Sequence, residues 1–373
     1  MKEGWEYRIF ESCLVKVPKQ VQVKSKDYKK EGKYPIVSQE AELISGYWDD
    51  ETIVYKHKDP VVIFGDHTKN IKYIDFNFVV GADGTHILST KKDISPKFFY
   101  YVLKSIKLRE LGYARHYKLL KEKYIPVPPL SEQQSIVSRL DAAFAKIDAM
   151  KVNAEKRLNE AKSLFQASLK KMLEPKEGWE QKKLKEFVVS ITDGDHQPPP
   201  KSDDGIPFIT ISNIEKNSNK IDFGETFYVP QSYYCALKKD RIPQKGDVLY
   251  TVTGSFGIPV LIDFQKEFCF QRHIALIRPN IGLLSPTYLF YWILSSYATS
   301  QAEDTATGTA QRTVSLNSLR NFTIHIPTFS TQQSIVASLD SLKSKVDRLQ
   351  ENYDKISQEC DALKQAILRQ VFE

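Results

Sequence analysis

The chain has 373 residues, 41% of them hydrophobic and 12% aromatic, which is enough apolar material for two packed cores. Its formal net charge of +7 at pH 7 is compatible with a nucleic-acid partner and equally with a solvated, lysine-rich surface. The longest apolar run is too short to span a bilayer, and neither the N-terminus nor the four cysteines indicate secretion, so we expect a cytoplasmic protein with reduced thiols and no membrane partner.

Two repeated segments indicate a tandem duplication. The sequence PLSEQQSIV at residues 129–137 returns 199 residues later as TFSTQQSIV, and KEGWE at residues 2–6 returns 174 residues later. The order is therefore globule, helix, globule, helix, and because the two offsets differ by 25, the second globule is longer by that amount. We expect four segments, which are a domain at 1–130, a central spacer helix at 131–175, a domain at 176–329 and a C-terminal spacer helix at 330–373.

The first globule has the pattern of short strands followed by one helix. The helix should begin at Ser95 and Pro96, with serine as its cap and proline in its first turn. In residues 72–80 apolar and polar residues alternate, which is the period of a half-buried strand. The expected strands are residues 34–38, 52–55, 60–64, 72–80, 86–90 and 125–128.

The segment after the first globule has the pattern of a coiled-coil helix. Its apolar positions recur in steps of three and four residues, with two consecutive four-residue steps around Ala154 that resemble a stutter. A capping box of Ser131 and Gln134 should start this helix, and Pro175 should end it. The expected seam is Ile136, Leu140, Ala143, Ile147, Met150, Ala154, Leu158, Ala161, Phe165, Ser168 and Met172.

The second globule repeats this plan, with a helix from Ser285 and Pro286. Its expected strands are residues 207–212, 247–252, 259–263, 268–270, 274–279 and 322–327. The last segment has an unbroken heptad pattern, which a capping box of Ser330 and Gln333 should begin. Its seam is Ile335, Leu339, Leu342, Val346, Leu349, Tyr353, Ile356, Cys360, Leu363 and Ile367.

A narrow apolar seam cannot be buried by one helix alone, so the two long helices should pair with each other. Because the second globule connects the end of one helix to the start of the next, the simplest pairing is antiparallel. Ordinary core helices are the alternative explanation for both segments.

The positive charge is concentrated in the first globule. Residues 1–130 carry 23 Lys and Arg against 17 Asp and Glu, a net charge of +6, whereas residues 176–329 carry 16 of each kind. By charge, the first globule is the better candidate for contact with nucleic acid.

The sequence contains no catalytic constellation. It lacks a phosphate-binding GxxxxGK[ST] loop, an HExxH zinc motif, a GxSxG nucleophile elbow, the kinase motifs and a glycine-rich adenosylmethionine loop. Residues 193–196, DGDH, could be a metal loop, but three prolines follow closely and a turn explains them better. We therefore expect no catalytic residue, no metal site and no cofactor in this chain.

Together these landmarks resemble the specificity subunit of type I restriction-modification enzymes. The resemblance covers the whole chain and rests on PLSEQQ at 129–134, its copy at 328–333 and the two KEGWE segments. In the second globule, residues 192–196, 205–208 and 308–311 also resemble the target-recognition domains of that family. The first globule departs from the pattern, because its DGTH segment at 83–86 lies in the middle of the domain.

The resemblance implies an α/β fold, in which two target-recognition domains are joined by two long antiparallel coiled-coil helices in a pseudo-twofold tandem repeat. It implies a non-catalytic subunit that reads a bipartite site on double-stranded DNA and docks two methyltransferase subunits and two restriction subunits, the latter carrying the motor and nuclease. S-adenosylmethionine, and ATP with Mg, are then expected on these partners.

Base-edge contacts require long polar side chains on loops, while phosphate contacts require only charge. Each candidate could equally be a solvated surface residue. The candidates for DNA binding are Lys69, Lys72, Arg115, His116 and Lys118 in the first domain, and Thr253, Ser255, Arg272, Gln311 and Arg312 in the second.

Two other functions stay open at this point. One is a coiled-coil protein–protein scaffold without DNA readout, which the neutral second domain favours. The other is an enzyme with an unrecognised site in the second globule.

Overall fold

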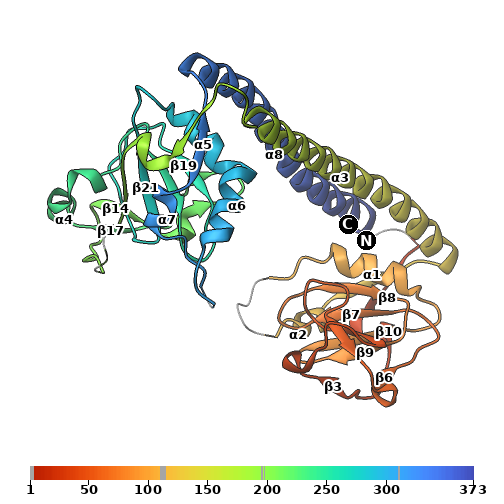
Figure 1. The fold of residues 1–373 in the computed structure, drawn as a ribbon. Helices are drawn as coiled ribbons and strands as arrows, with labels where there is room; N and C mark the ends of the chain where they lie inside the picture. The colour runs from red at the N-terminus through yellow and green to blue at the C-terminus, as the bar shows by residue number, and fades with distance from the viewer. Residues whose placement is uncertain (1–3, 110–114, 195, 197, 310) are drawn as a thin grey trace. The chain divides into compact units, whose positions relative to one another are not determined.

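The structure is a computed structural model, which describes residues 4–109, 115–194, 196, 198–309 and 311–373. The chain divides into two compact units (Figure 1). Unit 1 contains Met1–Ala154 and Asp354–Glu373, and unit 2 contains Glu155–Tyr353. Each unit therefore holds one globule and a part of each long helix. Among the described residues, no helix combines the length and the apolar character needed to cross a membrane.

Unit 1 is built around a four-stranded sheet in the order β2-β10-β7-β8 and a second sheet in the order β3-β9-β4-β5, with β6 also paired to β9. A separate pair, β1 with β11, connects the start of the globule to its end. The strands are β1 (Glu6–Ile9), β2 (Leu14–Val15), β3 (Gln22–Val23), β4 (Tyr34–Val37), β5 (Gly46–Trp48), β6 (Val54–Tyr55), β7 (Val61–Gly65), β8 (Ile71–Ile74), β9 (Phe78–Gly81), β10 (Thr85–Thr90) and β11 (Tyr124–Val127). The helices are α1 (Pro96–Ser105), α2 (Tyr117–Lys121) and the first part of α3 (Leu130–Met172).

Unit 2 has the matching four-stranded sheet, in the order β13-β21-β18-β19, and the matching terminal pair, β12 with β22. Smaller sheets, β17-β14-β20 and β15-β16, complete the globule. The strands are β12 (Glu180–Lys183), β13 (Val188–Asp193), β14 (Ile206–Ile209), β15 (Ile214–Glu215), β16 (Lys220–Ile221), β17 (Phe227–Val229), β18 (Val248–Thr251), β19 (Pro259–Leu261), β20 (Cys269–Phe270), β21 (Ile274–Pro279) and β22 (Thr323–Ile326). The helices are α4 (Gln231–Ala236), α5 (Pro286–Leu294), α6 (Ser296–Thr305), α7 (Leu316–Arg320) and α8 (Phe329–Phe372), whose last part belongs to unit 1.

The shared α/β plan of the two globules is confirmed, as are the starts of α1 and α5. Ser95 accepts a hydrogen bond from the Phe98 N–H, and Ser285 accepts one from the Tyr288 N–H. The single strand predicted at 72–80 is wrong, because it is interrupted between β8 and β9. These two strands belong to different sheets, so the alternation of apolar and polar residues continues although the chain passes from one sheet to the other.

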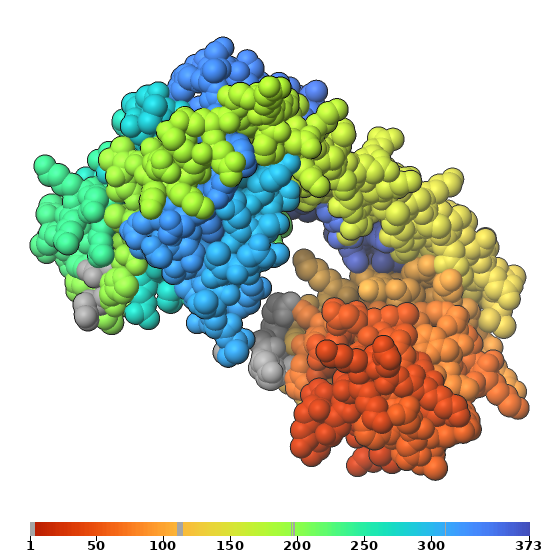
Figure 2. Space-filling view, viewed as in Figure 1, coloured from red at the N-terminus to blue at the C-terminus, as the bar shows by residue number. Residues whose placement is uncertain are grey.

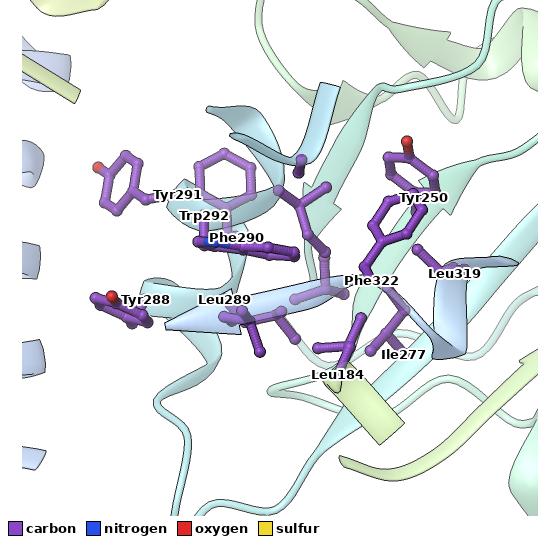
Figure 3. Close-up of a cluster of buried hydrophobic side chains, with 14 of the residues drawn as sticks. Leu184, Tyr250, Ile277, Tyr288, Leu289, Phe290, Tyr291, Trp292, Leu319 and Phe322 are labelled. Carbon is purple, nitrogen blue, oxygen red and sulfur yellow. The ribbon is translucent and has the colours of Figure 1, made fainter. Parts of the chain in front are cut away.

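The core of unit 2 gathers segments that are far apart in the sequence. Figure 2 shows α6 and α7 lying beside the yellow-green residues of β12 and β13 on the visible face of this unit, and α7 contacts β13. Beneath them, Leu184, Tyr250 and Phe322 are fully buried together with the apolar side chains of α5 (Figure 3). The first and last parts of the globule thus close over the central sheet, which explains why β12 pairs with β22.

The two long helices run antiparallel in unit 1. As residue numbers on α3 rise from Asp148 to Lys151, their partners on α8 fall from Lys364, at 2.5 Å, to Asp361, at 3.8 Å. Ile136 and Leu140 of α3 and Leu368 of α8 are buried in one cluster with the side chains of α1. In this unit, the helix pair and the globule therefore share one core.

Unit 2 holds the other parts of the same helices, which pack in a similar way. Lys162 of α3 donates a 2.7 Å hydrogen bond to Gln350 of α8. Phe165 and Leu169 of α3 and Leu339 of α8 are buried in the cluster that contains α5.

The seam departs from a strict heptad pattern in the middle of α3 and near the helix ends. Leu363 is 48% exposed and Met150 is 58% exposed, so neither lies on the buried face and both predictions are wrong. Leu169, Leu173 and Leu368 are buried instead. Near the ends, each helix packs on a globule as well as on the other helix. At Met150, close to the irregular spacing around Ala154, the mismatch between the 3.6-residue turn and the seven-residue repeat turns the predicted position outward. Ile136, Leu140, Ile147, Leu158, Phe165 and Leu339 are buried, and Ile335, Leu342, Val346, Leu349, Tyr353, Ile356 and Ile367 are partly buried.

Both predicted capping boxes are wrong, because each helix begins two residues earlier than a cap at Ser131 or Ser330 would require. The Thr328 hydroxyl, rather than Ser330, accepts the Thr331 N–H at the start of α8. At the start of α3 the Pro129 carbonyl accepts the first helical N–H groups. The repeated serine and second glutamine therefore lie exposed in the first turn.

The first glutamine of each repeat is buried, and we call its set of contacts the glutamine anchor. Gln133 is 0% exposed; its Oε1 accepts the Ser95 N–H at 2.8 Å, and its Nε2 donates to the carbonyls of Asp93, at 2.9 Å, and Pro128, at 2.8 Å. In unit 1 this side chain therefore joins the start of the long helix to the cap of α1 and to the end of the last strand.

The same anchor is present in unit 2. Gln332 is 1% exposed; it accepts the Ser285 N–H at 2.9 Å and donates to the carbonyls of Leu283, at 3.0 Å, and Pro327, at 3.2 Å. One amide side chain thus satisfies three backbone groups in each copy, which is what makes a buried glutamine stable here.

A second duplicated contact lies two turns further along each long helix. Tyr101 of α1 donates its hydroxyl proton to Asp141 at 2.5 Å, and Tyr291 of α5 donates to Asp340 at 2.6 Å. Figure 3 shows the Tyr291 hydroxyl directed away from the apolar cluster. Burial and the adjacent carboxylate both raise the pKa of each tyrosine, so each phenol remains a hydrogen-bond donor at neutral pH.

Replacing the anchoring glutamines tests their contribution to stability. Gln133→Leu and Gln332→Leu should each lower the free energy of unfolding by about 2 to 3 kcal/mol, because three backbone groups lose their partner. Gln134→Leu and Gln333→Leu are matched controls, since these neighbours are exposed; they should change stability by less than about 0.5 kcal/mol. The measurement is denaturant unfolding followed by circular dichroism, and equal effects in the two pairs would contradict the anchor.

The four cysteines are free, and three of them are buried. Burial raises the pKa of Cys13 to about 11 and that of Cys269 to about 12, so their thiolate fractions at neutral pH are very small. Cys360 lies between the long helices of unit 1, with its thiol 3.8 Å from the Ile147 carbonyl. Cys235 is exposed at the end of α4.

Thiol reactivity should therefore separate one cysteine from the other three. With a chromogenic disulfide reagent at neutral pH, Cys235 should react rapidly and the others only on unfolding, because attack requires an accessible thiolate. Cys235→Ser should remove the rapid phase. A rapid phase in that variant would contradict the burial of the remaining thiols.

Candidate nucleic-acid interface

The connections at one edge of each four-stranded sheet meet in what we call the loop junction. In unit 1 the loop after β7 lies between two other segments, because the Asp66 N–H donates to the Gly84 carbonyl and the Asp66 carbonyl accepts the His116 N–H, both at 2.8 Å. The loop after β7, the connection between β9 and β10 and the segment before α2 therefore come together.

Unit 2 repeats this hydrogen-bond pattern. The Val252 N–H donates to the His273 carbonyl at 2.9 Å, and the Val252 carbonyl accepts the Val314 N–H at 2.8 Å. The loop after β18, the turn before β21 and the segment before α7 meet here in the same order. Because a backbone pattern does not depend on side chains, the two junctions keep one geometry while their exposed residues differ.

A buried carboxylate organises the junction of unit 1. The side chain of Asp66 is 5% exposed and accepts the Tyr117 N–H at the start of α2 at 2.8 Å. His86 Nε2 lies 3.2 Å from the same carboxylate, and its ring stacks on Tyr117 at 4.0 Å. Arg115 Nε lies 3.9 Å from it, while most of the Arg115 side chain is exposed. Asp66 thus holds one cationic side chain at the surface of the junction.

The turn between β7 and β8 is built on close backbone approaches. A side chain at Gly65 would collide with Thr68 Oγ1 and with the β-carbon of Gln39. Gln39 also supports the turn directly, because its carbonyl accepts hydrogen bonds from Thr68 and from Asn70. Lys69 has a φ of 60°, a left-handed conformation that places this lysine at the tip of the turn.

In unit 2 an arginine is held on the junction by an aromatic ring. The Arg312 guanidinium lies 5.4 Å from the centre of the Phe256 ring and donates to the Glu303 carbonyl at 2.6 Å. Its own carbonyl accepts the Gly254 N–H at 3.0 Å. Gly308, with a φ of 103°, makes the preceding turn, in which a β-carbon would lie 2.5 Å from the Gln311 carbonyl. Arg312 is therefore exposed but oriented.

Arg272 occupies the turn on the other side of Val252. It is exposed, and its Nε lies 3.4 Å from His273 Nε2. Burial lowers the pKa of His273, and the charge of Arg272 lowers it further, so this imidazole is neutral at pH 7 and can accept from Arg272. The junction of unit 2 thus carries two exposed arginines, although the globule as a whole is neutral.

The structure brings most of the predicted DNA-binding residues to these junctions and exposes some of them. Arg115, Lys118, Ser255, Arg272, Gln311 and Arg312 are exposed, and Lys69 is partly buried. Three of the predicted residues are buried: Lys72, 6% exposed, His116, 1% exposed, and Thr253, 7% exposed.

The buried candidates are withdrawn as direct DNA contacts. The Lys72 ammonium donates to the Glu42 carbonyl inside unit 1, and His116 Nδ1 lies 3.0 Å from the Asp66 carbonyl. The Thr253 hydroxyl accepts a 3.3 Å hydrogen bond from Thr313. All three side chains stabilise the loops from within.

Asp193, in the segment that resembled a metal loop, is paired with two cationic or titratable side chains. His196 Nε2 lies 2.9 Å from one oxygen of Asp193, and Arg241 lies 3.5 Å from the other. Asp195 and Ala310, both part of the family-like segments, lie outside the described residues. Within the part of the chain that the structure describes, no group of three or more His, Cys, Asp or Glu residues is placed to hold a metal ion.

Several residues of the junctions were not found by sequence reasoning. They are Gln39, Asp66, His86, Tyr117 and Phe256, whose contacts mostly join segments far apart in the chain. The internal repeat offered one signal for them. When the two globules are aligned on β7 and β18, Asp66 and Val252 occupy the same position directly after the strand, which is where both junctions lie.

Comparison with known proteins agrees with this duplicated geometry. The family model described as the type I restriction modification DNA specificity domain matches residues 3–160 and 176–358. One match therefore covers each half of the duplication.

Individual relatives have low sequence identity to this chain but match it over long stretches. The specificity subunit of the type I restriction enzyme EcoBI of Escherichia coli is 23% identical over 282 residues, which is 68% of this chain and 59% of that subunit's length. The specificity subunit of EcoR124I/EcoR124II, also of Escherichia coli, is 24% identical over 345 residues, 87% of this chain and 82% of that subunit.

A solved structure has a similar fold. It comes from work on complex assembly and conformational transition of the type I restriction-modification system, with a TM-score of 0.69 and 18% identity over 100% of this chain and 98% of that chain. Because the family model matches both halves of the duplication, the chain belongs to the specificity subunits of type I restriction-modification systems.

Proposed function

We propose that this chain is the non-catalytic DNA-reading and assembly subunit of a type I restriction-modification complex. Each globule acts as a target-recognition domain, and the two together read a bipartite site on double-stranded DNA. The observation that carries the proposal is the loop junction, which is built twice with one backbone pattern and carries different exposed cations in each copy. A constant frame with variable side chains suits the reading of two different half-sites.

In this proposal residues 1–130 and 176–329 are the target-recognition domains, and residues 131–175 and 330–373 form an antiparallel coiled-coil spacer. The antiparallel contacts within each unit support a continuous spacer. Such a spacer fixes the number of base pairs between the two half-sites, because successive major-groove faces recur about every 34 to 36 Å.

Duplication also accounts for the partners that we propose. Two equivalent surfaces on one chain provide two binding sites for identical subunits, as in other twofold assemblies. Two methyltransferase subunits would bind at these sites, and two restriction subunits would complete the enzyme. S-adenosylmethionine, and ATP with Mg, would bind to those subunits, and the complex would act in the cytoplasm.

Arg312 is the side chain whose replacement best tests DNA reading by unit 2. Arg312→Ala should weaken binding of cognate duplex by about 5- to 150-fold, the effect of losing about 1 to 3 kcal/mol of contact energy. Binding is measured by fluorescence anisotropy with the methyltransferase partner present. The cognate site comes from mapping methylated adenines in the host genome.

Arg312→Lys is the matched variant, because it keeps the charge but loses the planar group that lies over Phe256. It should recover part of the affinity. Both variants should bind the methyltransferase normally. If neither changes affinity or methylation, Arg312 has no role in DNA contact, and if the unmodified complex does not bind DNA at all, the alternative of a protein–protein scaffold is favoured.

The length of the spacer gives a second test. Seven residues inserted at matched positions in α3 and α8 lengthen an antiparallel pair by about 10 Å, since each residue adds about 1.5 Å. The gap between methylated half-sites should then grow by about three base pairs, each of about 3.4 Å. The new gap is read from the methylated positions in the host genome.

Insertion into one helix alone is the control. It leaves the two helices out of register, so it should abolish activity instead of shifting the gap. An unchanged gap in the double insertion would contradict the spacer.

A further inference from the structure

Unit 1 contains a groove that is lined by positive charge, which we call the basic groove. It lies between the β7–β8 turn, the end of α1 and the last turns of α8. Its cationic residues are Lys69, Lys104, Lys107 and Arg369. Asn70, Ser105 and Gln365 add neutral hydrogen-bonding groups, and Glu373 is the acidic residue among the described residues that line it.

Three of the four cations of the basic groove have no anionic partner within the described part of the chain. There, Lys104, Lys107 and Arg369 take part in no ion pair, whereas Lys364 beside them is paired with Asp148 at 2.5 Å. Burial lowers the pKa of Lys104, and the charge of Lys364 lowers it further. A half-buried ammonium beside other cations is unfavourable unless an anion compensates it. The basic groove thus has the electrostatics of an anion-binding site.

The corresponding groove of unit 2 gives an internal comparison. It lies between the β18–β19 loop, the end of α5 and the long helices, and it contains Lys162, Lys216 and Lys343. Here more of the charge is compensated: Lys343 pairs with Asp347 at 2.7 Å, Lys162 donates to the neutral amide of Gln350 at 2.7 Å, and Glu303 also lines the groove. The excess positive charge of the first globule is therefore found in the groove of unit 1 and not in the corresponding groove of unit 2.

The basic groove is continuous with the loop junction of unit 1. Lys69 lies at the tip of the same turn that begins at Gly65 and Asp66, and it also lines the groove. A duplex read at the junction would pass close to this edge. A phosphodiester backbone is the anion that fits such a site, because it presents repeated single charges that separate lysines and an arginine can contact without reading sequence.

We propose that the basic groove binds the phosphate backbone of duplex DNA outside the recognised bases, and so supplies sequence-independent affinity that unit 2 lacks. This inference rests on the proposed DNA-reading function. Lys104, Lys107 and Arg369 are the residues that would contact phosphates, and Lys69 would connect them to the junction.

The salt dependence of binding tests this proposal. The probe is a fluorescent random-sequence duplex, added to the full chain in complex with its methyltransferase partner. Each phosphate contact contributes about 0.9 to the slope of log K against log salt concentration. The triple variant Lys104→Gln, Lys107→Gln, Arg369→Gln should therefore reduce the slope by about 2 to 3, while the affinity ratio of cognate to random duplex stays unchanged.

Matched changes in unit 2 provide the control. Lys162→Gln and Lys343→Gln should leave the slope unchanged, because those lysines already have partners. If the triple variant does not fold, Lys107→Gln alone still tests the proposal, since Lys107 is exposed and its loss should reduce the slope by about 1.

Three results would overturn the inference, namely an unchanged slope in these variants, a changed preference for cognate DNA, or loss of the methyltransferase. The last would assign the basic groove to a protein partner. Failure of the unmodified complex to bind any duplex would instead refute the proposed function itself, so the two failures can be distinguished.

Discussion

The fold depends on a single kind of side chain at the point where each long helix begins. Gln133 and Gln332 are buried, and each connects the helix to the cap of a short helix and to the end of the last strand of its own globule. The tyrosine–aspartate contacts two turns later add a second fixed point on the same helix face. Two points define a direction, so each globule is oriented on its helix and not merely attached to it.

Local patterns in the sequence were sufficient for much of the architecture. The duplication, the two long helices and the starts of α1 and α5 all depend on residues close together in the chain, which is why they could be predicted. The interruption at residues 75–77 between β8 and β9, and the packing of Leu169 and Leu368, depend on which other segment lies opposite. Sequence periodicity does not contain that information, since it reports only that one face is apolar.

The candidate site could be predicted only as a set of loops. Arg312 and Arg272 were chosen because arginine on a loop can reach a base or a phosphate, and the structure exposes both. Lys72 was chosen by the same reasoning and is buried. The difference arises from the Glu42 carbonyl, which is 30 residues away in the chain and offers that ammonium a partner inside the globule. Charge alone could not distinguish an internal lysine from an exposed one.

The glutamine anchor recognises only main-chain atoms on its globule: one N–H and two carbonyls in each copy. Main-chain atoms are the same whatever side chains surround them. A globule of different sequence can therefore be mounted on the same helix, provided that its chain follows the same path at these few positions. The long helix can thus stay constant while the globule attached to it changes. A recombination break placed in the PLSEQQ segment would yield a chain with a new globule and with the contacts of the glutamine anchor intact.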